Sequence, residues 1–220
     1  KSLEHRRKVN SIFMYNREFQ KYHVYESNID PVLRLMHRTG IQSTGWLDSG
    51  DSCVRCHLSK TDIDLWCNEW STLKPVERDD MAPFVVASFD IECNSSTGKF
   101  PDPNVPDDAC FQIAISLCKF GSDEPYDKTC LCFKKTDQNI EGSNIISFDT
   151  EREMLLAFKK YVNEKDIDII TGWNIFGFDL EYIYKRAAMV GCGVEFYQLG
   201  KLNDTECHLV LKQLSSSALG

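Results

Sequence analysis

Two nearly continuous apolar runs constrain the fold of this chain more than any other feature of its sequence. Residues 84–91 form one run and residues 167–171 form the other. Runs of this kind, with few polar residues, are typical of strands in the interior of a sheet. Thr150 and Glu153 form a capping box that opens a helical pattern before the second run. The chain therefore predicts an α/β fold with a central sheet.

Further elements are expected on both sides of these runs. Residues 111–118 and 129–133 read as strands, and a helix starting at Asp179 is expected to end at Gly191. Residues 94–108 form a loop rich in Gly, Pro and Asp. The predicted order over residues 81–220 is thus three strands, a helix, a strand and a helix, which form one domain.

The first 80 residues have a different character and are predicted to form part of a separate α+β domain. Residues 9–26 alternate aromatic and polar residues and are predicted to form a strand. Asp30 and Pro31 give an N-cap and a first-turn proline. We expect the amphipathic helix that follows to pack through its apolar residues, which are Val32, Leu33 and Met36. We place the domain boundary near residue 80.

Composition favours a globular protein from a reducing, intracellular compartment. The hydrophobic and charged fractions are 42% and 26%, and no apolar stretch has the length of a membrane span. The ten cysteines lack the spacing of a disulfide framework, and no secretory signal follows the basic N-terminus. The net charge of −8 argues against unspecific nucleic-acid binding. Residues 1–25 contain six Lys or Arg and only two Glu. This basic segment could be either a solvated face or a DNA contact.

Acidic residues lie at the end of the first apolar run and after the second. Asp90 and Glu92 are two residues apart on the first predicted strand, so their side chains share a face, while Ile91 points to the other. A polar strand end facing solvent is the simplest alternative. Asp179 follows the second run after a loop, where an N-cap is the alternative role and Asn174 can hydrogen-bond locally. Clustered carboxylates require a neutralising cation, which suits two-metal phosphodiester chemistry.

These segments resemble a known family. Phe89-Asp90-Ile91-Glu92 resembles the first exonuclease motif of family-B DNA polymerases, and the stretch from Asn174 to Phe178-Asp179 resembles the second. Residues 25–29, 98–101, 112–113 and 168–174 are similar to delta-type members, so the likeness covers most of the chain. It is strongest to the replicative polymerases of large DNA viruses, especially those of algae.

The resemblance implies a ribonuclease H-like fold and a proofreading 3′–5′ exonuclease. Asp90, Glu92 and Asp179 would be the catalytic metal ligands of two Mg²⁺ ions, which Mn²⁺ can replace. Asn174 and Phe178 would bind the single-stranded 3′ end. DNA, deoxynucleotides and a sliding clamp are the partners implied for the whole polymerase. The implied location is the host nucleus or a viral replication factory.

The family's third motif, a Tyr and an Asp four residues apart, is not found after Asp179, and both ends of the chain look cut. We therefore expect a polymerase fragment covering the N-terminal region and an incomplete exonuclease domain, with little or no nuclease activity by itself. The alternatives are a stand-alone ribonuclease H-like exonuclease and an inactive DNA-binding or assembly module of that fold.

Four residues could form a second site, and they are Cys53, Cys56, His57 and Cys67. A zinc site is one interpretation of this group. The haem-attachment pattern also matches, but it does not suit an intracellular chain. Adjacent Cys56 and His57 are awkward ligands for one ion, so we expect ordinary loop cysteines.

Overall fold

The computed structural model describes residues 29–137 and 140–210 of the 220-residue chain. They divide into two compact units at Asp80/Met81, except that His57–Asp64 belongs to the second unit. The strand expected at residues 9–26 lies outside the described residues. Among the helices of the described part, none has the length and apolar character needed to cross a membrane.

The first element in the described part of the first unit is helix α2 (Pro31–Thr39). Its predicted N-cap is confirmed, because the Asp30 side chain accepts a hydrogen bond from the Val32 N–H at 2.8 Å. The prediction that this helix packs through its apolar face is wrong for the described part of the chain, where none of its residues is buried. Val32 and Leu33 remain 63% and 51% exposed. An amphipathic pattern sets where apolar residues point and not whether another element covers them.

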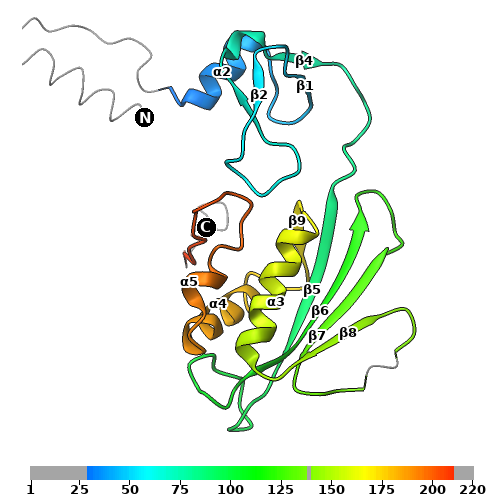
Figure 1. Cartoon of the computed structure of the whole chain (residues 1–220), viewed down its shortest axis with the longest axis vertical. Helices are drawn as coiled ribbons and strands as arrows, with labels where there is room; N and C mark the ends of the chain where they lie inside the picture. The colour runs from blue at the N-terminus through cyan, green and yellow to red at the C-terminus, as the bar shows by residue number, and fades with distance from the viewer. Residues whose placement is uncertain (1–28, 138–139, 211–220) are drawn as a thin grey trace, which may run out of the picture. The chain divides into compact units, whose positions relative to one another are not determined.

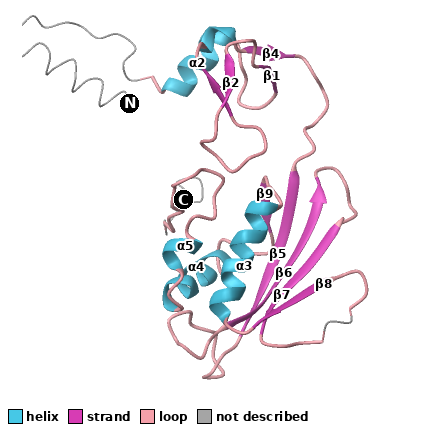
Figure 2. Cartoon of the chain, in the orientation of Figure 1, coloured by secondary structure: helices cyan, strands magenta, loops and turns pink. Residues whose placement is uncertain are grey.

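The rest of the first unit consists of two small antiparallel ladders, shown in Figures 1 and 2. Strand β1 (Trp46–Asp48) pairs with β4 (Lys74–Val76), and β2 (Cys53–Arg55) pairs with β3 (Leu65–Cys67). A 3-10 turn, η2 (Trp70–Thr72), precedes β4.

The second unit is built on a five-stranded mixed sheet of order β8-β7-β6-β5-β9. Strands β5 (Val85–Cys93), β6 (Cys110–Lys119) and β7 (Asp127–Phe133) lie within two residues of their predicted ends, and they are antiparallel neighbours. Strand β9 (Ile169–Thr171) joins β5 in parallel, and β8 (Asn144–Phe148), which was not predicted, joins β7 in parallel. Strand β5 is therefore interior, as its apolar run indicated.

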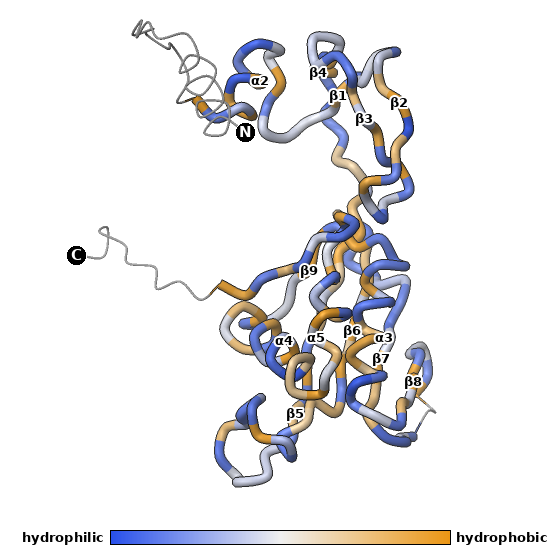
Figure 3. The backbone as a smooth tube through the Cα atoms, turned by 60° about the vertical axis from the view of Figure 1, so that its left-hand side comes forward, coloured by the Kyte–Doolittle hydropathy of each residue, from blue (hydrophilic) through white to orange (hydrophobic). Residues whose placement is uncertain are grey.

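Helices cover one face of this sheet (Figure 2). They are α3 (Glu151–Glu164), α4 (Asp179–Met189) and α5 (Gly193–Phe196). The predicted capping box of α3 is present, with Thr150 and Glu153 bonded reciprocally. Hydrophobic and hydrophilic residues alternate along α3 and α4 in Figure 3, as expected for helices with one buried face. The core between helices and sheet includes Phe89, Ile91, Leu155 and Phe158. The other face of β5 carries the exposed side chains of Ser88, Asp90 and Glu92.

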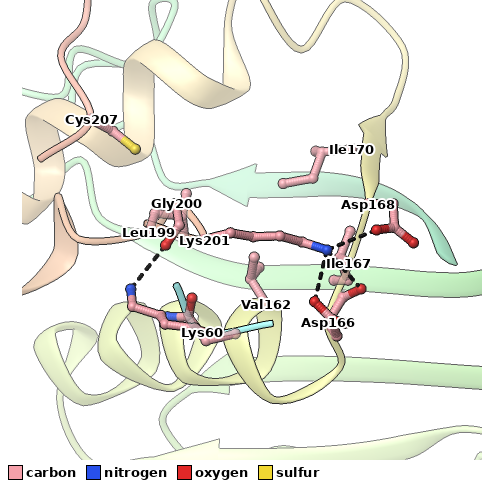
Figure 4. Close-up of a pocket in the computed structure, with 11 residues that line it drawn as sticks. Lys60, Val162, Asp166, Ile167, Asp168, Ile170, Leu199, Gly200, Lys201 and Cys207 are labelled. Carbon is pink, nitrogen blue, oxygen red and sulfur yellow. Dashed lines mark hydrogen bonds and ion pairs between the residues drawn. The ribbon is translucent and has the colours of Figure 1, made fainter. Parts of the chain in front are cut away.

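A network of polar contacts fastens residues 198–203 to two other parts of the second unit (Figure 4). The Lys60 ammonium donates to the carbonyls of Gln198 and Gly200 at 2.7 and 2.9 Å. The Lys201 ammonium pairs with Asp166 and Asp168, both at 2.7 Å. Asp168 in turn accepts a hydrogen bond from the Val85 N–H at 2.8 Å. The start of β5, the strand that carries Asp90, is thereby tied to the end of the described chain.

Candidate active site

Strand β5 presents two carboxylates on the open face of the sheet. Asp90 and Glu92 are exposed, whereas Ile91 between them is buried in the core, 6% exposed. The prediction that the two acids share one face is confirmed, since residues two apart in a strand point the same way. Both residues lie within the β5–β6 ladder, where Asp90 is paired with Ala114 and Glu92 with Gln112.

Asp179 arrives at the same place from the first turn of α4. The alternative role as an N-cap is wrong, because Phe178 occupies that position and no side chain caps the helix. Asp179 is instead 2% exposed, and its Oδ1 accepts a hydrogen bond from the Ile91 N–H at 3.2 Å. The side chain thus reaches across to the backbone between Asp90 and Glu92.

The electrostatics of Asp179 reflect this position. Burial raises the pKa of its carboxyl group, and the neighbouring Asp90 carboxyl adds to the rise through its charge and a hydrogen bond. The backbone N–H groups of Asp179 and Ile91 act in the opposite direction without cancelling the increase in pKa. Two carboxylates in contact repel each other when both are ionised, so a cation between them would be favourable.

The donor set fits a hard divalent cation. Mg²⁺ prefers carboxylate oxygens and commonly takes only one or two from the protein, with waters or substrate phosphates completing its shell. Asp90 and Asp179 supply that number. Across residues 29–137 and 140–210, however, no three His, Cys, Asp or Glu side chains are gathered closely enough to hold an ion. Glu92 shares the face of Asp90 but does not complete such a cluster.

The turn between β9 and α4 depends on two close approaches. A Cβ on Gly172 would lie 2.4 Å from the Phe89 carbonyl oxygen, and one on Gly177 would lie 2.3 Å from the Asn174 side-chain oxygen. Asn174 itself has a left-handed backbone, with φ of 53°, and its carbonyl accepts from the Gly177 and Phe178 N–H groups. Asn174 therefore shapes the turn that delivers Asp179.

Aromatic side chains surround this turn. The Phe178 ring contacts Phe100 and Tyr182, each with 5.1 Å between ring centroids, so it packs within an aromatic cluster. Trp173 and Phe176 are 90% and 83% exposed. Neither ring was predicted as a site residue, although their positions on either side of Asn174 are a signal that the sequence carries.

Trp173 also borders an open groove on the uncovered face of the sheet. The groove has a volume of about 590 Å³ and includes Asp90 in its lining, along with small residues such as Ala114 and Ser116. Lys128 contributes a positive charge to the same groove. An exposed indole and a carboxylate thus share one concave surface.

The cysteines of the first unit do not form a metal site among the described residues. All ten cysteines of the chain lie in the described part, and none is disulfide-bonded. The prediction that Cys53 and Cys67 are loop residues is wrong, since they lie opposite each other in the β2–β3 ladder. A hairpin this short has almost no sequence pattern of its own.

With this geometry established, comparison with known proteins places the chain in a family. A profile described as "DNA polymerase family B, exonuclease domain" matches residues 22–218. The chain belongs to this family. Its mixed sheet with helices on one face is the α/β, ribonuclease H-like fold of that domain, as predicted.

Similar sequences are found in viral polymerases and in delta catalytic subunits. A DNA polymerase of Paramecium bursaria Chlorella virus NY2A is 31% identical over 209 residues, covering 91% of this chain and 22% of the relative. A DNA polymerase of Acanthamoeba polyphaga mimivirus is 39% identical over 168 residues, 75% of this chain and 10% of the relative. A DNA polymerase delta catalytic subunit of Oryza sativa subsp. japonica is 35% identical over 202 residues, 89% of this chain and 18% of the relative. The chain thus spans less than a quarter of the length of these relatives.

Proposed function

We propose that this chain is the N-terminal region and part of the proofreading 3′–5′ exonuclease domain of a replicative DNA polymerase. Asp90, Glu92 and Asp179 are its catalytic residues and metal ligands. The observation that carries the proposal is the hydrogen bond from the Ile91 N–H to the Asp179 carboxylate, which holds an acid from a distant segment at the strand backbone between Asp90 and Glu92.

Asp90 and Glu92 share one task in this proposal, and Asp179 has another. Asp90 and Glu92, on the open face, hold the ions that contact the terminal phosphodiester. Asp179 is fixed by the Ile91 N–H, so its carboxylate is already oriented before any ion binds. Two bound Mg²⁺ ions would supply an activated water and stabilise charge on the leaving 3′ oxygen. The protein's own contribution is to place the acids and the DNA end.

The aromatic residues near the turn would hold the single-stranded 3′ end. Bases stack on exposed aromatic rings whatever their sequence, which suits a proofreading substrate. Trp173 and Phe176 offer such rings, and Lys128 offers a charge for a phosphate. Asn174 would bind the DNA end from the turn, and Phe178 would shape the cleft from within the aromatic cluster.

The proposal extends to the parts of the polymerase around this domain. Residues 1–80 would be part of the polymerase N-terminal domain, and residues 81–220 an incomplete exonuclease domain that lacks its third motif. The whole polymerase would act on primer-template DNA with deoxynucleotides and a sliding clamp. It would work in a host nucleus or a viral replication factory.

Metal binding by the chain itself gives the first test. We expect Mn²⁺, titrated calorimetrically into the 220-residue chain, to bind weakly at one or two sites. Asp90→Asn and Asp179→Asn should each abolish binding. Asp123→Asn changes an exposed loop carboxyl outside the site and serves as the matched control. Equal binding by all four proteins would contradict the assignment.

Activity gives the second test. The chain alone should degrade a labelled single-stranded oligonucleotide poorly or not at all. In the complete polymerase, Asp90→Ala should lower exonuclease activity by about 10³-fold, because metal ions contribute several kcal/mol to such reactions. Polymerisation should persist. Strong Mg²⁺- and Asp90-dependent digestion by the chain alone would instead favour a stand-alone exonuclease. A polymerase whose exonuclease tolerates Asp90→Ala would refute the site.

A further inference from the structure

The β2–β3 ladder contains a pair of cysteines that the proposed nuclease function does not use. Cys53 and Cys67 are register partners in this antiparallel pair, so both side chains point to the same face. Their neighbours in the ladder, Val54 and Trp66, are 51% and 52% exposed on the opposite face. Cys53 and Cys67 are each half-buried, which leaves both thiols within reach of small solutes.

The geometry of this pair matches that of a disulfide. Opposite residues of an antiparallel pair have Cα atoms about 4.5 or about 5.5 Å apart, depending on their place in the ladder. Disulfides span Cα separations of about 4.4–6.8 Å, so either distance is suitable. The two thiols also influence each other electrostatically, since each contributes to the shift in the other's pKa.

The two thiols differ in their surroundings. The Cys67 Sγ lies 3.6 Å from the Ser52 hydroxyl and 3.2 Å from the Glu69 carbonyl oxygen. The Ser52 contact is the main reason that the pKa of Cys67 is lowered, and Cys53 and Thr72 add to the effect. Desolvation, followed by the contact with Cys67, raises the pKa of Cys53. Cys67 is therefore the better nucleophile at neutral pH and Cys53 the resolving thiol.

We propose that Cys53 and Cys67 form a reversible cross-strand disulfide when the protein meets a hydroperoxide. The Cys67 thiolate attacks the peroxide oxygen, which breaks the O–O bond, releases hydroxide and leaves a sulfenic acid on Cys67. The Cys53 sulfur then attacks the Cys67 sulfur and expels water. In total, two thiols and one hydrogen peroxide give one disulfide and two waters. A dithiol reductant restores both thiols and becomes a disulfide itself.

A disulfide at this place closes the ring of residues 53–67 at the base of loop His57–Asp64. Within the second unit this loop is held by the Lys60 ammonium, whose contact with the Gly200 carbonyl is drawn in Figure 4, and by a hydrogen bond from the Asn203 N–H to the Leu58 carbonyl at 3.0 Å. The Asp64 side chain accepts hydrogen bonds from two backbone N–H groups of the same loop, Leu58 at 2.5 Å and Ser59 at 2.6 Å. Oxidation would thus fix the two ends of a loop that is already ordered.

The other neighbouring cysteines provide an internal comparison. Cys93 and Cys110 are also register partners, in the β5–β6 ladder, but Cys110 is fully buried. Cys132 is buried as well. The pKa of its neighbour Cys130 is raised to about 11, first by burial and then by the contact with Cys132. These pairs are expected to react later than Cys53 and Cys67, since peroxide needs access to a thiolate.

Peptide mapping after mild oxidation tests the proposal. The reduced chain is treated with a few equivalents of hydrogen peroxide, blocked with an alkylating agent and digested with trypsin without reduction. Cleavage after Arg38, Arg55, Lys60 and Arg78 puts Cys53, Cys56 and Cys67 on three different peptides. We expect the linked peptides 39–55 and 61–78 to be the first disulfide product, and dithiothreitol to remove it.

Variants show whether the pairing is specific. Cys56→Ser is the matched control and should leave the 53–67 link unchanged. Cys53→Ser should remove the link and leave Cys67 as a sulfinic acid or, with glutathione present, a mixed disulfide. Links from Cys56 to either partner as the main product would overturn the proposal. So would oxidation of the exposed Cys207 while Cys53 and Cys67 stay reduced, or a zinc ion on these cysteines in native mass spectrometry.

Discussion

The Asp179 carboxylate accepts a hydrogen bond from the backbone N–H of Ile91, with 3.2 Å between Oδ1 and N. Ile91 lies between Asp90 and Glu92 on β5, so this single bond ties the first turn of α4 to the strand that carries the other two acids. It connects residues 88 positions apart in the sequence. The bond explains why the buried Asp179 carboxylate lies next to β5 although it does not cap helix α4.

Replacing Asp179 with Asn should relieve the repulsion by Asp90. The folded state raises the pKa of Asp179, so its ionisation costs stability as pH rises through the unfolded value, about 3.9, and the folded one above it. Asp179→Asn keeps an acceptor for the Ile91 N–H. We expect the variant to equal or exceed the wild type in free energy of unfolding at pH 7 in EDTA, by up to about 1 kcal/mol.

Urea unfolding at pH 7 and pH 4.5 measures this difference, which should shrink at the lower pH. Mg²⁺ should stabilise the wild type and not the variant. If the variant is less stable than the wild type at both pH 7 and pH 4.5, the charge of Asp179 stabilises the fold.

Gly172→Ala should disturb the contact between β9 and β5. Its Cβ would lie 2.4 Å from the Phe89 carbonyl oxygen, which is backbone and cannot rotate away. We expect a loss of about 1–3 kcal/mol in the free energy of unfolding. Gly200→Ala is the control, because its Cβ meets only the Cys207 Sγ at 3.4 Å. Equal midpoints in thermal unfolding for the two variants would contradict this account.

The buried ion pair between Arg186 and Glu151 joins α4 to α3. Arg186 is 2% exposed, and its Nε donates to Glu151 at 2.8 Å. Arg186→Met would leave the buried Glu151 carboxylate with the Cys110 N–H but without its counter-charge, which should cost about 3–5 kcal/mol. Arg152→Met removes an exposed pair with Glu195 and should cost about 0–1 kcal/mol. Denaturant titration measures the free energy of unfolding of both variants. Similar losses in the two would contradict the claim that the buried ion pair matters more than the exposed one.

Asp108 should make the fold sensitive to acid. Its carboxylate is buried and accepts hydrogen bonds from the hydroxyl and N–H of Ser96 and from the Asp102 N–H. These bonds, the Ser96 hydroxyl first, lower its pKa in the folded state. The stabilisation is present above the unfolded pKa of about 3.9 and is lost as pH falls through the lower folded value.

Asp108→Asn should therefore be less stable at pH 7, by about 1.5–3 kcal/mol for bonds to a charged group. The deficit should narrow as the pH is lowered below about 4. Unfolding curves across this range provide the measurement. A deficit that does not change with pH would mean that the charge is unimportant and that only the shape of the side chain matters.

Several features were predictable because they depend on neighbouring residues alone. The capping box at Thr150, the N-cap at Asp30 and the interior strand β5 all follow from residues a few positions apart. The shared face of Asp90 and Glu92 follows from the two-residue period of a strand. Strand β8 escaped prediction, since its five residues carry no strong pattern and its place is set by pairing with β7.

The sequence by itself determined the order of β5, β6, β7, α3, β9 and α4, the shared face of Asp90 and Glu92, and the family resemblance through residues 89–92 and 174–179. Only the tertiary structure decided that Asp179 contacts β5 and does not cap α4, that Cys53 faces Cys67, and that Val32 and Leu33 stay exposed. The physical reason is the range of the interactions. Caps and side-chain alternation act within one or two turns of the chain, whereas these contacts depend on which distant segments pack together and exclude water.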